Sequence, residues 1–194
     1  DASPQFVGAT EAWSSLGGQD NAGSNVVVGV LDTGIWPEHP SYADNGLPAP
    51  AGGPYGCQFG DGTDVAHLGP TFACNDKLVG AYAFLNSYMA NTGADADEFC
   101  NNTTKKCSAR DADGHGTHTS STAAGSRVNS AMLYGVQRGP ISGMAPGARV
   151  IMYRVCAALG CYNGDSVAAV QQAILDDVDV INFSISGGNN PYTD

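Results

Sequence analysis

The stretch VVVGVLDTGIW, residues 26–36, runs from an uninterrupted apolar segment into an aspartate. Valine and leucine without polar alternation are typical of a strand that is buried on both faces of a parallel sheet. Asp32 ends this run, and the Thr-Gly that follows it favours a turn. Because reacting groups in open α/β sheets collect at the carboxyl ends of strands, we expect Asp32 to lie at a functional site.

A strand–helix–strand pattern follows nearer the end of the chain. Residues 149–155 and 178–185 are predicted strands. Between them we expect a helix that is capped by Asp165 and carries apolar residues in steps of three and four. This apolar stripe consists of Val167, Val170, Ile174 and Val178. Strand, helix and strand of these lengths form a βαβ unit, so the sequence predicts an α/β fold with a parallel sheet.

The other expected elements lie earlier in the chain. We predict a short helix over residues 3–13, a strand over residues 78–85, and a helix of small residues over His115–Ala124 that ends at Gly125. The segments between these elements are rich in Gly, Pro and polar residues and are expected to be loops. No linker divides the 194 residues, so we expect a single domain.

The composition excludes some classes of partner. The chain has 8 Lys plus Arg against 19 Asp plus Glu, which gives a net charge of -11. Such a chain repels phosphate groups, so no nucleic acid is expected as a partner. No apolar run approaches the roughly 20 residues that a membrane helix needs, so no membrane partner is expected. The first residues, DASPQFVG, do not resemble a signal peptide, and we expect that any targeting segment has been removed.

The six cysteines fall in close pairs along the sequence. This spacing predicts three local disulfides, which would join Cys57 to Cys74, Cys100 to Cys107, and Cys156 to Cys161. Spacing alone does not fix the pairing, and a zinc site is the rival interpretation. The chain has no C-x-x-C step and no histidine near the cysteines, which argues against zinc. Disulfides imply an oxidising compartment.

The stretch DADGHGTHTSS, residues 111–121, holds the second candidate for chemistry. His115 stands between glycines at the start of a predicted helix, where it can be held rigidly and still reach solvent. If its ring donates one proton to Asp32, the other nitrogen faces outward as a base, as in a Ser-His-Asp triad. A histidine that only caps the helix is the structural alternative. A metal site at His115 and His118 is disfavoured, because they lack the i, i+4 step of the H-E-x-x-H motif.

Asp32 also has two other interpretations. Its carboxylate can simply cap the turn that follows it. Asp-Thr-Gly is also the motif of aspartic proteases, which need two carboxylates that share a proton. The chain has one such motif, so that chemistry would require a homodimer, and the predicted helices and βαβ unit argue against an all-β protease.

Several motifs together resemble those of the subtilisin-like serine proteases (subtilases), most closely the cucumisin-like, plant-type branch. In order along the chain they are SPQFVG, VVVGVLDTGIWPEHPSY, DGHGTHTSSTAAG, GMAPGARVIMYRVC and VINFSISGG. The resemblance implies a three-layer α/β fold with helices on both faces of a mostly parallel sheet, incomplete in this chain. It also implies a serine endopeptidase whose catalytic Asp and His fall on Asp32 and His115.

The resemblance carries further expectations. The motif VINFSISGG matches the strand that binds substrate backbone. The substrate-binding residues are therefore expected to be Ser184, Ile185, Ser186 and Gly187. Ser186 replaces a glycine of the family pattern, so we expect altered side-chain preference beside the scissile bond. The family is made as a zymogen, so a propeptide is an expected partner before maturation, and the pairs Cys57–Cys74 and Cys156–Cys161 have counterparts in it.

Two parts of the family's machinery are missing from this sequence. The nucleophilic serine stands in a Gly-Thr-Ser motif, and the oxyanion asparagine stands in a later motif, but neither motif occurs here. We therefore expect residues 1–194 to be the amino-terminal part of one catalytic domain, with a companion polypeptide that carries the Ser and the Asn. A cut after Asp194 would fall in a loop. The alternative is a catalytically inactive fragment or pseudoprotease that binds peptides by strand addition.

The remaining expectations concern localisation and modification. Asn101 and Asn102 begin two overlapping glycosylation acceptors in a predicted loop. A glycosylated, disulfide-bonded protein is expected to be secreted, with the vacuole or cell wall as possible destinations. The run DADG, residues 111–114, lacks a full set of calcium ligands, so neither calcium nor another cofactor is predicted.

Overall fold

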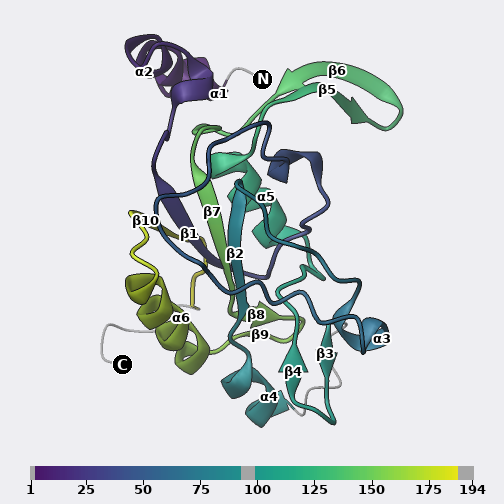
Figure 1. The fold of residues 1–194 in the computed structure, drawn as a ribbon. Helices are drawn as coiled ribbons and strands as arrows, with labels where there is room; N and C mark the ends of the chain where they lie inside the picture. The colour runs from purple at the N-terminus through teal and green to yellow at the C-terminus, as the bar shows by residue number, and fades with distance from the viewer. Residues whose placement is uncertain (1–2, 93–98, 188–194) are drawn as a thin grey trace.

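The computed structural model describes residues 3–92 and 99–187. Its centre is a four-stranded sheet in the order β10–β1–β7–β2, and all neighbouring strands are parallel (Figure 1). The strands are β1 (Val27–Asp32), β2 (Leu78–Ala83), β7 (Arg149–Arg154) and β10 (Val180–Phe183). The predicted α/β class with a parallel sheet is confirmed. Residues 188–194, where the sequence analysis placed a cut end, lie outside the described residues.

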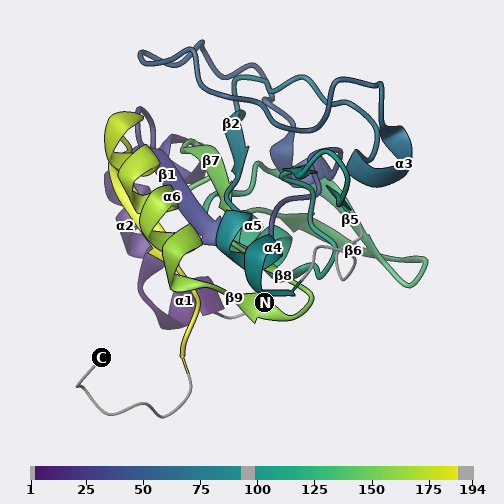
Figure 2. The ribbon, with the colours of Figure 1, turned by 90° about the horizontal axis from the view of Figure 1, so that it is seen from below.

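Helices cover the two faces of this sheet. Val28 and Val30 of β1 pack in the same cluster as Ala124 of α5 (His115–Ala124). Leu31, on the other side of β1, packs with Ala169 of α6 (Asn163–Leu175). Successive residues of one strand therefore point into different clusters, which is why the strand is apolar at nearly every position. In Figure 2, α6 lies on one side of the molecule, and the long loop before β2, with α3 (Val65–Leu68), lies along another.

Within α6, the predicted stripe residues Val167, Val170 and Ile174 lie on the outer face, whereas Val178, beyond the end of the helix, packs against the core. Ala169 and Ala173 are fully buried there, whereas Val167 and Ile174 are 68% and 70% exposed. Small alanine side chains let the helix lie close against β1 and β7, and the larger apolar residues are left on the outer face. An outward apolar face normally packs against another element. The periodicity predicted the helix correctly, but it did not show which face packs on the sheet.

Asp165 does not cap α6, because the cap position is held by Tyr162. The Asp165 carboxylate is buried and accepts hydrogen bonds from the backbone nitrogens of Ser87 and Tyr88, both at 2.8 Å. These nitrogens open α4 (Asn86–Thr92), and the first turn of a helix has unpaired N–H groups. The carboxylate thus caps a neighbouring helix and joins α4 to α6.

Other elements depart from the sequence prediction. The expected amino-terminal helix is two helices, α1 (Ser3–Phe6) and α2 (Ala9–Ser15), separated where Gly8 has a φ of 75°. A hairpin of β5 (Val128–Leu133) and β6 (Val136–Ile141) extends from the body and was not predicted (Figure 1). The remaining short elements are η1 (Gln19–Asn21), η2 (Pro40–Tyr42), β3 (Cys100–Asn101), β4 (Lys106–Cys107), β8 (Cys156–Ala157) and β9 (Gly160–Cys161).

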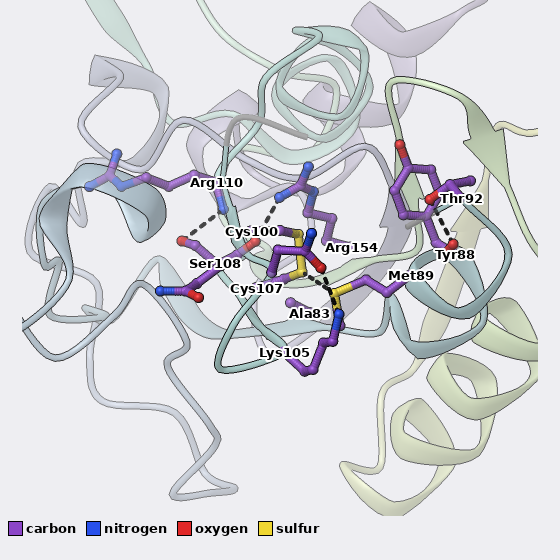
Figure 3. Close-up of a disulfide and its surroundings, with 12 residues drawn as sticks. Ala83, Tyr88, Met89, Thr92, Cys100, Lys105, Cys107, Ser108, Arg110 and Arg154 are labelled. Atoms are coloured by element: carbon purple, nitrogen blue, oxygen red, sulfur yellow. Dashed lines mark hydrogen bonds between the residues drawn. A yellow bond between two sulfur atoms is a disulfide. The ribbon is translucent and has the colours of Figure 1, made fainter. Parts of the chain in front are cut away.

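Three disulfides join the cysteines in the expected pairs, Cys57–Cys74, Cys100–Cys107 and Cys156–Cys161. The second and third each close a small antiparallel ladder in which the two cysteines are direct partners. Figure 3 shows the Cys100–Cys107 bond, with the sulfur of Met89 lying 3.6 Å from that of Cys107. The Cys156–Cys161 disulfide therefore braces the segment that directly follows β7, at the carboxyl end of the sheet.

Candidate active site

Asp32 ends β1 at the carboxyl edge of the sheet and is fully buried. One carboxylate oxygen, Oδ1, accepts a hydrogen bond from the backbone nitrogen of Thr33 at 2.7 Å and lies 2.7 Å from Nδ1 of His115. The other, Oδ2, accepts a hydrogen bond from the hydroxyl of Thr119 at 2.9 Å. All the recorded partners of this carboxylate are donors, and none is a second carboxylate.

His115 is the first residue of α5, and its side chain is 47% exposed. An ionised carboxylate only accepts hydrogen bonds, so the proton between the two side chains belongs to Nδ1 of the imidazole. Within the described residues, no hydrogen bond reaches the other ring nitrogen, Nε2. The hydrogen bond with Asp32 and the charge of Asp32 raise the pKa of His115, with smaller contributions from Asp113 and Asp111.

Two glycines bring the imidazole to the carboxylate. A Cβ on Gly116 would overlap the backbone oxygen of Gly34 and come within 3.1 Å of the Cβ of Asp32. Gly34 has a φ of 118°, and a Cβ there would lie 2.6 Å from the backbone oxygen of Arg110. The start of α5 can therefore touch the turn after β1 because Gly116 has no side chain, and that turn can lie against the backbone of Arg110 because Gly34 has none.

Asp111, which the sequence analysis did not single out, links these two segments. Its carboxylate accepts hydrogen bonds from the hydroxyls of Thr33, at 2.9 Å, and Thr117, at 2.6 Å. It also accepts from the backbone nitrogens of Gly114 and Thr117, both at 2.8 Å. Burial alone would raise the pKa of Asp111, but these hydrogen bonds together lower it. An aspartate four residues before the histidine was the available signal, and only the fold shows what it binds.

The four residues predicted to bind substrate follow β10 directly. Because Leu31 pairs with Phe183, the chain leaves β10 at the level of Asp32. Ser184 and Ser186 are exposed, and Gly187 is also exposed, whereas Ile185 packs against the cluster beneath α6. No recorded hydrogen bond connects this described segment to Asp32 or His115, so the structure places it near the edge of the site without testing its role.

Metal ligands are not gathered in the part of the chain that the structure describes. No group of three or more His, Cys, Asp or Glu side chains is arranged to hold an ion there. The six cysteines are all in disulfides. The chemistry that the described residues can supply at this edge is therefore that of an oriented imidazole next to a buried carboxylate.

We expect Asp32→Asn to lower the pKa of His115, because the neutral amide removes the charge that favours the imidazolium. A raised pKa in the folded state stabilises the fold at acid pH, and this contribution is lost as the pH rises through the folded pKa. Asp32→Asn should therefore lack this stabilisation of the folded state at acid pH. Histidine ring resonances followed by NMR against pH measure the shift, with Asp113→Asn as a control that should lower the pKa less. An unchanged His115 titration in Asp32→Asn would contradict the contact.

We expect Gly116→Ala to lower the free energy of unfolding, although alanine favours helix by about 1 kcal/mol over glycine. The added Cβ meets backbone that cannot move aside, and such overpacking costs about 1–3 kcal/mol. Gly164→Ala in α6 is the matched control, because its added Cβ meets only the side chain of Ser87, which can rotate. Thermal unfolding of the intact protein measures both variants, and equal melting temperatures would contradict the close approach.

Comparison with known proteins identifies the family of the chain. Residues 23–194 match the subtilase family. Subtilisin-like protease SBT1.7 of Arabidopsis thaliana is 44% identical over 97% of this chain and 24% of its own length. Subtilisin-like proteases SBT1.4 and SBT1.5 of the same plant are 43% and 42% identical, over 96% and 98% of this chain and 23% of each relative. The chain thus spans about a quarter of the length of these relatives. By this match and this identity, the chain belongs to the subtilase family.

Proposed function

We propose that the protein containing this chain is a serine endopeptidase that hydrolyses peptide bonds through a Ser-His-Asp triad. Asp32 and His115 supply two members of the triad, and the serine lies on a polypeptide segment outside residues 1–194. The observation that carries the proposal is the 2.7 Å contact between Asp32 and Nδ1 of His115. It fixes the tautomer in which Nε2 has a lone pair and can act as a base.

In this reaction Nε2 of His115 takes the proton of the serine hydroxyl while the serine oxygen attacks the peptide carbonyl. The imidazolium that forms is stabilised by the buried charge of Asp32. It then gives its proton to the leaving amine as the peptide bond breaks and an acyl-enzyme remains. Water hydrolyses the acyl-enzyme by the same exchange of protons, and the serine is regenerated.

Exposed apolar surface supports the presence of a further segment. Strands of parallel sheets are normally buried on both faces. In the described residues β10 has β1 as its only neighbour, and Val180 and Phe183 are 53% and 49% exposed. The outer face of α6 is equally apolar, with Leu175 73% exposed. The remaining part of the domain, which would bring the serine and the oxyanion asparagine, is the natural cover for these surfaces.

The substrate is a peptide or protein, bound in extended form beside the segment after β10. The role of Ser184, Ile185, Ser186 and Gly187 in this binding stays a prediction. Exposure of Ser186 is compatible with a hydroxymethyl group that narrows a neighbouring subsite. The second candidate function is peptide binding by strand addition without catalysis, for which the exposed β10 is suited. A binding protein has no need of the paired Asp32 and His115, so we favour the protease.

A fluorophosphonate probe separates the two functions. We expect it to label a serine outside residues 1–194 in the intact wild-type protein, because Nε2 of His115 activates that serine. Labelling should be lost in His115→Ala and retained in His118→Ala, which changes an exposed histidine on the same helix. Mass spectrometry of the labelled peptide identifies the site. An unlabelled wild type that still binds peptides would support the non-catalytic alternative.

We further propose that the protein is secreted, since its disulfides need an oxidising compartment. Among the described residues, no helix is long and apolar enough to cross a bilayer.

Asn101 and Asn102, the two predicted glycosylation acceptors, stand in the hairpin formed by β3 and β4. The side-chain nitrogen of Asn101 donates to Asp64, and its oxygen accepts from the backbone of Thr103 at 2.8 Å. The side-chain oxygen of Asn102 accepts a hydrogen bond from Nζ of Lys105 at 2.6 Å.

We expect a glycan on Asn102 and none on Asn101. N-glycosylation uses the side-chain nitrogen, and on Asn101 that nitrogen is engaged with Asp64, so a glycan there would displace this contact. Glycopeptide mapping of the protein from a glycosylating host measures this, with each asparagine changed to Gln in turn. Asn102→Gln should lose the glycan and Asn101→Gln should keep it. The reverse pattern would show the assignment to be wrong.

A further inference from the structure

Thr119 stands on the same face of α5 as His115, one turn further along the helix. Residues four apart in a helix lie one above the other, so both side chains can reach the same group. That group is Asp32, which meets His115 through Oδ1 and Thr119 through Oδ2 at 2.9 Å. One helix therefore holds both oxygens of the buried carboxylate.

The hydroxyl of Thr119 has a choice of acceptors. Serine and threonine in helices often bond to a carbonyl of the preceding turn, and the hydroxyl of Thr119 lies 3.2 Å from the oxygen of Gly116. The hydroxyl has one proton to donate, so it serves one acceptor at a time. The carboxylate of Asp32 is nearer and charged, which makes it the stronger acceptor. The next two residues differ, because the hydroxyls of Ser120 and Ser121 bond to carbonyls of their own helix at 2.6 Å and 3.1 Å.

The environment of Asp32 makes this hydrogen bond hard to replace. Asp32 is 0% exposed, so water does not readily take the place of a lost donor. A buried carboxylate oxygen without a donor is costly, and the carboxylate can relieve this by turning about its bond to Cβ. Such a turn would move Oδ1 away from Nδ1 of His115. A donor on Oδ2 opposes that rotation.

We propose that Thr119 is a positioning residue for the hydrolysis: its hydroxyl anchors Oδ2 of Asp32 and thereby holds Oδ1 on Nδ1 of His115. The proposal rests on the proposed function for its kinetic consequence and on the contacts above for its geometry. Thr119 does not touch the reacting atoms, and it acts through Asp32 on the orientation of the imidazole.

Three variants of the intact enzyme test the role. Thr119→Val keeps the shape and removes the hydroxyl, Thr119→Ser keeps the hydroxyl, and Thr122→Val makes the same change at an exposed position of α5. We expect kcat, per titrated active site, to fall about tenfold in Thr119→Val with KM unchanged. Thr119→Ser should restore most of kcat, and Thr122→Val should match the wild type. Equal kcat in Thr119→Val and Thr122→Val would overturn the proposal.

A second measurement reports on the geometry alone. The proton that His115 shares with Asp32 gives a far-downfield NMR resonance, which we expect to shift or broaden in Thr119→Val, to return in Thr119→Ser and to stay unchanged in Thr122→Val. An unmoved resonance in Thr119→Val would overturn the anchor. Fluorophosphonate labelling of the wild type keeps the two proposals distinct. If the wild type is labelled but Thr119→Val has the kcat and the resonance of the wild type, only the role of Thr119 is overturned. An unlabelled wild type overturns the proposed hydrolysis.

Discussion

The structure depends on one contact, the hydrogen bond between the carboxylate of Asp32 and Nδ1 of His115. It joins residues 83 positions apart in the sequence at a distance of 2.7 Å. The contact requires a carboxylate at the end of a buried strand and an imidazole at the first turn of a helix. It also requires that helix and turn meet backbone to backbone, which the missing side chain of Gly116 allows. Burying the charge of Asp32 costs free energy, and hydrogen-bond donors to both of its carboxylate oxygens offset this cost.

The parallel sheet explains why the contact forms where it does. β1 lies between β10 and β7, and Leu31 is paired on both sides, while Asp32 is paired with Arg154 of β7, so the position of Asp32 is fixed by the sheet. The helix α5 covers one face of the sheet and presents its first turn at the same edge. Asp111 then ties the loop before α5 to Thr33, the residue after Asp32. The site is a product of strand order and loop hydrogen bonds together.

Sequence patterns predicted the elements that carry strong signals and missed the ones that depend on neighbours. The apolar run before Asp32 and the small-residue helix after His115 were predicted nearly to the residue, because periodicity and end signals are local. The periodicity of α6 did not show which face of the helix packs on the sheet, since that depends on what lies on each side of the helix. Asp165 was assigned to its own helix, whereas its partners are in α4. Thr119 gave no signal, because a threonine in a helix usually satisfies its own backbone.

A crystal structure of the intact mature protein, bound to a peptide-like inhibitor, tests the account most directly. The account predicts that Oδ1 of Asp32 stays within hydrogen-bonding distance of Nδ1 of His115. It further predicts that a serine hydroxyl from outside residues 1–194 lies within reach of Nε2, with the missing segment packed on β10 and the outer face of α6. An imidazole turned away from Asp32, or an Nε2 with no serine beside it, would contradict the account.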